Sequence, residues 1–415
     1  MRFYLTVVTA GPLLFLATSA FVLGRAPATA LPVADSPTSP HSPGAAARGG
    51  ARSLLKAAAD HGIASCGSNA THIGWIGDDG EVSHQPRDEA RARMMAYLWT
   101  NVMPYDVPNA RTLGFDSSRI LPQSSDGEGT ENHGYHSSSI SREMREQVAV
   151  DGLSDGIINQ TLHYALQAKA LYPWTDVIPR SMYMEYVVPY AVVNEPRSDH
   201  RPLLFHALRD TLREYERSNH AQTHTIQTQI KQVVKLVNSR LWAVLGRDSS
   251  TPIVFRAGLT PRIYDPLSVI AYGHSSCTGL AILLIAALRS VGIPSRMAGT
   301  PAWHGNEEDG NHSWVEVFVP GVVDGEEGGR WVFLEPSPGI AEGEEDAANS
   351  DDLERDPCER WFCDATRFDG ATRVFATRYS RSDTHYPMAW ALGDKGVPGE
   401  DRTSYYTETC GNCDH

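Results

Sequence analysis

The pattern of apolar positions is most regular directly after Cys277, where it predicts a buried helix. The apolar residues recur at helical spacing: Leu280, Leu283, Leu284, Ala287 and Leu288. Gly292, followed by Ile293 and Pro294, is a typical helix stop. Cys277 therefore lies in the first turn, where free backbone N–H groups and the helix dipole favour a thiolate, the reactive form of cysteine. Without partners, Cys277 would simply be a small apolar residue that begins a core helix.

Two segments further along the chain alternate their side chains as strands do. The first spans residues 311–319 and begins with His312. Its two-residue period predicts that four residues share one face: His312, Trp314, Glu316 and Phe318. The second spans residues 330–336 and ends in Glu335, directly before a proline. Because residues 321–329 form an acidic, glycine-rich turn, the two segments predict a hairpin.

A cysteine on a helix, a histidine on a strand and an acid on the adjacent strand can act together as a relay. The histidine takes the thiol proton, and the acid holds the histidine ring in the required tautomer. Taken alone, His312 is more simply a structural histidine and Glu335 a surface acid at a strand end. Their order with Cys277 favours a catalytic triad instead.

These residues together resemble the transglutaminase-like core, a papain-like cysteine fold shared by transglutaminases, peptide N-glycanases and many microbial proteins. The resemblance covers about residues 272–338: the Cys277 helix, the turn at 292–296, the His312-x-Trp-x-Glu-Val sequence, and residues 331–336. A looser resemblance to a secreted or periplasmic subgroup includes residues 185–190, 194–196, 361–362 and 386–390. Family members usually have aspartate as the third residue, whereas this chain has Glu335, whose side chain is one methylene longer.

The resemblance implies an α+β fold in which the cysteine helix packs on an antiparallel sheet. It implies acyl transfer or hydrolysis at a carboxamide or peptide bond, with Cys277 as nucleophile, His312 as base and Glu335 as its orienting acid. The Cys277 N–H is the first oxyanion donor, and this chemistry requires no metal or organic cofactor. A cysteine protease or a peptide N-glycanase-like amidase is an alternative. A non-catalytic binding module on the same fold is the alternative of another class.

Three residues near the histidine segment are candidates for substrate binding: Trp303, His304 and Trp314. Trp303 and His304 directly precede the histidine strand and are expected to line the cleft. A packed loop tryptophan is an equally good interpretation of Trp303.

Residues 53–250 predict a mainly helical extension upstream of a core at residues 251–340. Residues 87–98 consist of good helix formers, and residues 139–172 carry apolar side chains at mixed helical spacing. Residues 223–245 form a clear amphipathic pattern. Residues 182–190 predict a buried connector between helices.

The N-terminal residues 1–30 predict a secretory signal peptide. An apolar run from Phe3 to Leu23, interrupted by Gly11 and Pro12, is followed by small residues. An uncleaved membrane anchor is the alternative, because the run is nearly long enough to span a bilayer. Residues 31–52 are rich in Pro, Ser, Ala and Gly and predict a disordered linker. We therefore expect a secreted or extracytoplasmic protein without stable membrane insertion after cleavage.

The composition narrows the set of partners. A formal net charge of −14 argues against nucleic acid or an anionic membrane as a partner. The resemblance to the transglutaminase-like core implies a protein or peptide substrate. Residues 341–415 predict an acidic loop and an aromatic, cysteine-containing extension that ends in Cys410-Gly-Asn-Cys413. That pair is compatible with a redox site or half of a metal site, but the sequence has no second Cys-x-x-Cys to complete a zinc site, and disulfide bonding is the more ordinary interpretation. In a secreted protein the five cysteines besides Cys277 are also disulfide candidates, with the connectivity open: Cys66, Cys358, Cys363, Cys410 and Cys413.

Overall fold

The computed structural model describes residues 5–10, 13–18, 71–78, 81–103, 106–107, 113–114, 156–219, 226–247, 251–260, 263–320, 329–340, 362–363, 365–380, 385–387, 392–393 and 396–411. The chain divides into two units, residues 1–42 and residues 43–415. In the first unit the apolar run forms an antiparallel strand pair, β1 (Leu5–Ala10) and β2 (Leu13–Thr18). The expected cleavage region and the predicted linker lie outside the described residues.

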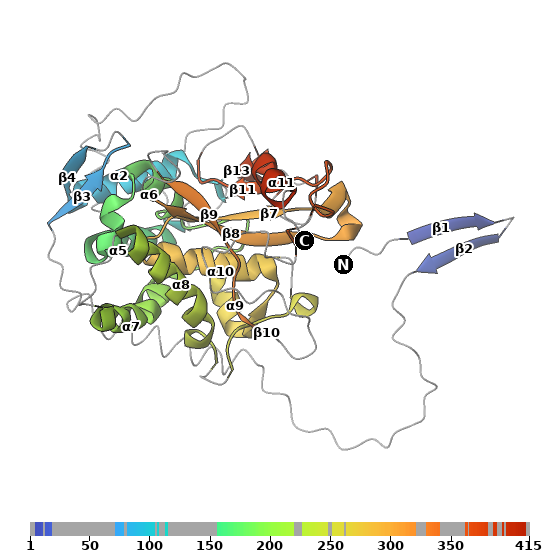
Figure 1. The fold of residues 1–415 in the computed structure, drawn as a ribbon, viewed down its shortest axis with the longest axis horizontal. Coiled ribbons are helices and arrows are strands. Elements are labelled where there is room, and N and C mark those ends of the chain that lie inside the picture. Colours follow the sequence, from blue (N-terminus) through green and yellow to red (C-terminus); the bar gives the residue numbers. More distant parts are fainter. Residues whose placement is uncertain are drawn as a thin grey trace, which may run out of the picture. The chain divides into compact units, whose positions relative to one another are not determined.

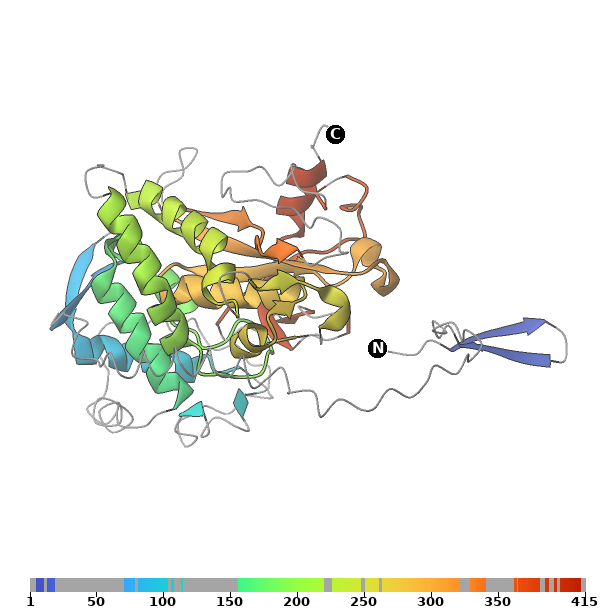
Figure 2. The same cartoon turned by 90° about the horizontal axis from the view of Figure 1, so that it is seen from below.

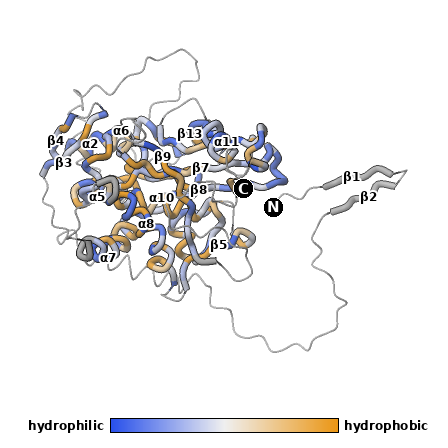
Figure 3. Tube along the Cα trace, viewed as in Figure 1, coloured by the Kyte–Doolittle hydropathy of each residue, from blue (hydrophilic) through white to orange (hydrophobic). Residues whose placement is uncertain are grey.

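The second unit is built around helix α10 (Cys277–Ser290), which confirms the predicted buried helix. Gly292 has φ +80°, the left-handed conformation that terminates a helix and favours glycine. Every residue of α10 after Cys277 is buried, and the helix is largely apolar along its length (Figure 3). Helices α5 (Ile157–Leu171), α7 (Arg201–Asn219) and α8 (Ile226–Val244) pack against α10, and the main sheet covers another side (Figures 1 and 2).

The main sheet has six strands, and each strand pairs antiparallel with its neighbours. Their order across the sheet is β12 (His385–Tyr386), β13 (Val397–Asp401), β11 (Phe375–Thr377), β7 (Ser295–Thr300), β8 (His312–Val319) and β9 (Arg330–Leu334). Strands β8 and β9 pair as the predicted hairpin, with Val315 opposite Leu334. A smaller parallel sheet joins β10 (Gly339–Ile340), β5 (Val254–Phe255) and β6 (His274–Ser275), and β6 leads directly into α10.

Strand β8 is buried along its whole length because both of its faces are covered. Val315, Val317 and Val319 belong to the large apolar cluster that includes α10. On the opposite face, the indole N–H of Trp314 donates to Tyr406 Oη, and that hydroxyl donates to Glu316. Tyr406 belongs to α11 (Thr403–Gly411), so the C-terminal helix covers this side of the strand. The predicted shared face of Trp314 and Glu316 is confirmed.

Where the region upstream of the core is described, it consists of helices and one short hairpin. Helices α2 (Arg87–Thr100) and α8 occur where the pattern predicts them, whereas α5 begins at Ile157 and the earlier part of that prediction lies outside the described residues. A hairpin of β3 (His72–Ile76) and β4 (Val82–Pro86) was not predicted.

The remaining short elements of the described residues, from both the upstream region and the core, are η4 (Pro173–Val177), α6 (Arg180–Tyr186), η5 (Ala257–Leu259), α9 (Pro266–Tyr272), η6 (Trp303–Gly305) and η7 (Glu307–Asp309).

One apolar cluster contains residues of α7, α8, α10 and the main sheet. The helical region and the predicted core therefore share a hydrophobic interior across residue 250, and a boundary at that residue stays a prediction from sequence.

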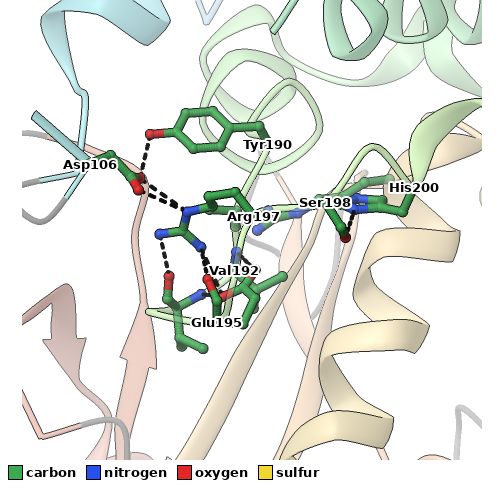
Figure 4. A network of polar contacts seen from close by, with 10 residues as sticks. Asp106, Tyr190, Val192, Glu195, Arg197, Ser198 and His200 are labelled. Carbon is green, nitrogen blue, oxygen red and sulfur yellow. Dashed lines mark hydrogen bonds and ion pairs between the residues drawn. The ribbon is translucent and has the colours of Figure 1, made fainter. Parts of the chain in front are cut away.

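The connector between α6 and α7 is fixed by a buried polar network (Figure 4). The Glu195 carboxylate accepts hydrogen bonds from the backbone N–H groups of Val192 and Val193, at 2.8 and 2.7 Å. Arg197 forms an ion pair with Asp106 at 3.1 Å, and the Tyr190 hydroxyl donates to the same carboxylate at 2.7 Å. Polar groups buried in this way stabilise a fold only when their partners are in place. The polar residues of this network therefore have a structural role, which is to hold the connector in place.

The C-terminal segment packs on the sheet and contains a disulfide bond. Cys363 and Cys410 are bonded to each other, 47 residues apart in sequence, and both are fully buried. The interpretation of Cys410 and Cys413 as a redox pair or half of a metal site is therefore wrong, because Cys410 already has another partner. Phe362, Phe368 and Phe375 are buried as expected for this extension, and most of the acidic loop lies outside the described residues.

Where the chain is described, none of its helices combines the length and the apolar content needed to cross a bilayer.

Candidate active site

Cys277 occupies the first residue of α10, where the sequence places it. Its side chain is partly exposed and carries no disulfide, whereas the residues that follow it in the helix are buried. The preceding residue, Ser276, is the N-cap and makes no side-chain capping bond. The sulfur has two hydrogen-bond partners, the His312 side chain and the backbone of Ser313. The thiol of a partly exposed cysteine at a helix N-terminus, next to an imidazole, fits the setting of a reactive cysteine.

His312 begins strand β8 and lies between Cys277 and Glu335. Its Nε2 is 3.1 Å from Glu335 Oε1 and 3.3 Å from Oε2, and the two side chains are 6% and 5% exposed. Because Nε2 is directed at the carboxylate, Nδ1 is the nitrogen left to face the thiol. The structure therefore brings the three residues together in the order cysteine, histidine, glutamate, although they come from a helix, a strand and the end of the next strand.

The electrostatics of the three groups favour a thiolate beside an imidazolium. Burial alone would lower the pKa of His312, but the Glu335 carboxylate and the Cys277 sulfur outweigh it and raise this pKa to about 10. Burial also opposes the charged form of Cys277, yet the hydrogen bond and charge of His312 lower the pKa of the thiol below its usual range. The two shifts have opposite directions because each charged form stabilises the other.

Glu335 is held by a residue that the sequence did not single out. Asn238 of α8 is fully buried, and its side-chain amide donates to the backbone carbonyl of Glu335 at 2.9 Å. Its amide oxygen accepts from the backbone N–H of Ser337 at 3.1 Å. Asn238 thus fixes the chain on both sides of Pro336. The signal in the sequence is an asparagine beside Val237, on the apolar stripe of an otherwise clear amphipathic helix.

Trp314 lies behind the histidine. The indole is completely buried, its ring centroid is 5.7 Å from that of His312, and its N–H is bonded to Tyr406. In this position the indole supports the histidine from the core side. Its predicted part in substrate binding stays a prediction.

Trp303 and His304 lie in η6, in the loop before β8. Trp303 is only 2% exposed and packs edge-on against Phe368, with the centroids 5.4 Å apart, which matches the interpretation of a packed loop tryptophan. His304 adopts φ 55°, and its partly exposed Nδ1 lies 3.0 Å from Asp369. Substrate contacts by these two residues stay predictions.

The site thus consists of a partly exposed cysteine at the start of a buried helix, next to a buried histidine–glutamate pair, in a domain of mixed helix and sheet. Residues 219–336 match the core model of the Transglutaminase-like superfamily. This part of the chain is therefore a transglutaminase-like superfamily domain, as the sequence motifs indicated. The match includes Cys277, His312 and Glu335. It points to a family of cysteine-based acyl transfer or hydrolysis. No curated protein and no solved structure matches the chain.

Proposed function

We propose that this protein is a secreted transglutaminase-like enzyme with a papain-like core and a Cys277–His312–Glu335 triad. The observation that carries the proposal is the continuous chain of contacts from the thiol to His312 and from His312 to Glu335 at 3.1 Å. Nucleophile, base and orienting acid in this geometry are the elements by which an activated nucleophile is recognised.

In the first half-reaction the Cys277 thiolate attacks the carbonyl carbon of a carboxamide or peptide bond. The carbonyl oxygen becomes an oxyanion, for which the backbone N–H of Cys277 and the positive end of α10 supply stabilisation. The C–N bond then breaks, and the His312 imidazolium gives its proton to the departing nitrogen. The products are a thioester on Cys277 and free ammonia or an amine.

In the second half-reaction an amine or a water molecule attacks the thioester carbonyl. Neutral His312 takes the proton of the attacking group, the C–S bond breaks, and the Cys277 thiolate is restored beside an imidazolium. Glu335 orients the imidazole and stabilises its charged form. An amine acceptor gives a cross-linked or modified protein. A water molecule as acceptor gives deamidation, proteolysis or N-glycan release. These are the reactions of the protease and amidase alternatives.

Location outside the cytoplasm is also part of the proposal. Two observations support it. The first is the apolar N-terminal run followed by small residues, and the second is the buried Cys363–Cys410 disulfide. Structural disulfides persist in oxidising compartments and are rare in the cytosol. The substrate class that we propose is a protein or peptide, and the acidic net charge of −14 would disfavour nucleic acid.

Amine incorporation tests the transferase form of the proposal directly. Purified protein is incubated with dimethylated casein and dansylcadaverine, and bound fluorescence and released ammonia are measured together. Equal release of ammonia and incorporation of dansyl amine is expected for a transferase, whereas ammonia without amine indicates a hydrolase. Cys277→Ala is expected to abolish both signals, because the thioester cannot form. Turnover that survives Cys277→Ala would rule out the covalent mechanism.

Glu335→Gln tests the third member of the triad. Loss of the carboxylate removes the main charge that raises the pKa of His312, so this pKa should fall from about 10 toward its ordinary value. The imidazolium form is then lost at lower pH, and the alkaline limb of the rate profile should move to lower pH. We expect turnover to fall by about 10²–10⁴-fold, the usual contribution of positioned acid–base catalysis. A rate profile identical to that of the unmodified protein would remove Glu335 from the mechanism.

A further inference from the structure

The ring of His312 is covered by an aromatic side chain from outside the family domain. Phe362 is fully buried, and its ring centroid lies 4.8 Å from that of His312 and 5.1 Å from that of Trp314. The match to the superfamily ends at residue 336. Phe362 thus lies outside the residues that match the superfamily model, and its ring contacts the central residue of the proposed triad.

The position of Phe362 is fixed by covalent and polar attachments of the C-terminal segment. The next residue, Cys363, is bonded to Cys410 of α11. Helix α11 is in turn held against the sheet by Tyr406, whose hydroxyl accepts from Trp314 at 2.8 Å and donates to Glu316 at 2.9 Å. The disulfide and Tyr406 therefore hold Phe362 in contact with both His312 and Trp314.

The packing of Phe362 against His312 matters because the histidine ring has to interact with two partners at once. Its Nε2 faces Glu335, and its other ring nitrogen faces Cys277. The outer torsion of a histidine side chain has broad preferences, so the ring needs packing to keep both nitrogens aligned. An aromatic face within about 6 Å also favours the charged imidazolium. Among the described residues, Glu335 and Cys277 are the charged groups with the largest effect on the pKa of His312, while Trp314 and Phe362 pack against it with aromatic rings.

We propose that Phe362, anchored by the Cys363–Cys410 disulfide, is a positioning residue that holds the His312 ring in line with Cys277 and Glu335. This inference rests on the proposed function, because it concerns the geometry of the same triad. In this role, the C-terminal segment contributes a residue that maintains the geometry of the site. It also links catalysis to the disulfide, because breaking the disulfide would release the residue next to Phe362.

Phe362→Leu tests the inference, with Phe205→Leu as the matched control. Both phenylalanines are buried, but Phe205 belongs to α7 and packs against Tyr164 and Tyr172, at 5.1 and 6.2 Å. The rate of iodoacetamide alkylation at Cys277 is followed by peptide mass spectrometry from pH 4 to 9, with the melting temperature of each variant recorded. In Phe362→Leu we expect the acid limb of the alkylation profile to move to higher pH by about one unit, so that alkylation on that limb falls about tenfold at a given pH. Phe205→Leu should keep the original profile.

A second variant covers the case in which Phe362→Leu does not fold. Cys363→Ala/Cys410→Ala keeps the Phe362 side chain but removes the disulfide that anchors it, and it should shift the profile in the same direction. The role of Phe362 alone would be overturned if the unmodified protein is labelled fast at pH 6 and every folded variant has the same pH profile of Cys277 alkylation. Slow labelling of the unmodified protein at pH 6 would instead contradict the proposed triad itself.

Discussion

Replacing His312 with alanine is expected to reduce turnover by at least about 10⁴-fold. The variant loses the base that takes the thiol proton, the acid that protonates the leaving nitrogen, and the charge that stabilises the thiolate. Members of a catalytic unit act together, so removal of the base alone costs nearly as much as removal of the whole unit, about 10⁶-fold in a serine protease. Turnover is measured by dansylcadaverine incorporation or ammonia release, whichever the unmodified protein supports.

His84→Ala serves as the control for His312→Ala. His84 lies on β4 and is exposed, so its loss should leave turnover within about twofold, as is usual for surface changes away from a site. A loss of less than tenfold in His312→Ala, with the melting temperature preserved, would show that His312 is not the base.

Glu316→Ala is expected to lower the free energy of unfolding by about 3–5 kcal/mol. Glu316 is 1% exposed, and it forms ion pairs with Arg296 at 2.7 Å and with Arg402 at 3.1 Å. Arg296 is itself fully buried, and its other carboxylate partner, Glu400, is 35% exposed. Removing one partner of a buried ion pair leaves an uncompensated charge in the interior, which is the origin of the large cost. Urea unfolding at pH 7 measures it.

A surface pair provides the comparison for Glu316. Glu89 forms an ion pair with Arg93 one helical turn away, at 2.9 Å, and the two side chains are 27% and 12% exposed. Glu89→Ala should cost no more than about 0.5 kcal/mol, the usual value for such a helical pair. A cost below about 1 kcal/mol for Glu316→Ala would mean that the interior of the sheet reorganises around Arg296.

The parts of the site that the sequence predicts are those with local signals. The α10 helix follows from apolar spacing and a glycine stop, and the β8–β9 hairpin follows from alternation around a turn. The order of Cys277, His312 and Glu335 along these elements was enough to identify the candidate triad. Each of these signals is a pattern along a continuous segment of the chain, so each can be detected without knowledge of the tertiary contacts.

Residues that act through distant contacts could not be predicted in the same way. Asn238 reaches the end of β9 from α8, and Phe362 reaches His312 from beyond the acidic loop. The sequence does not distinguish a substrate-binding role from a core position for Trp303 and Trp314, because an aromatic side chain suits a binding surface and a core equally well. Only the covering C-terminal segment decides that both are buried, and no local pattern reveals which face of the sheet that segment covers.

The most direct test of the account is the pH dependence of Cys277 alkylation by iodoacetamide, with and without His312. The pKa of the thiol is lowered and that of His312 is raised to about 10, so the thiolate–imidazolium pair should persist between these two values. We predict fast labelling at pH 6, a decline as the pH falls through the lowered thiol pKa, and loss of the fast reaction in His312→Ala. Labelling that appears only near the ordinary thiol pKa of about 8.5, and is the same in both proteins, would contradict an activated cysteine at this site.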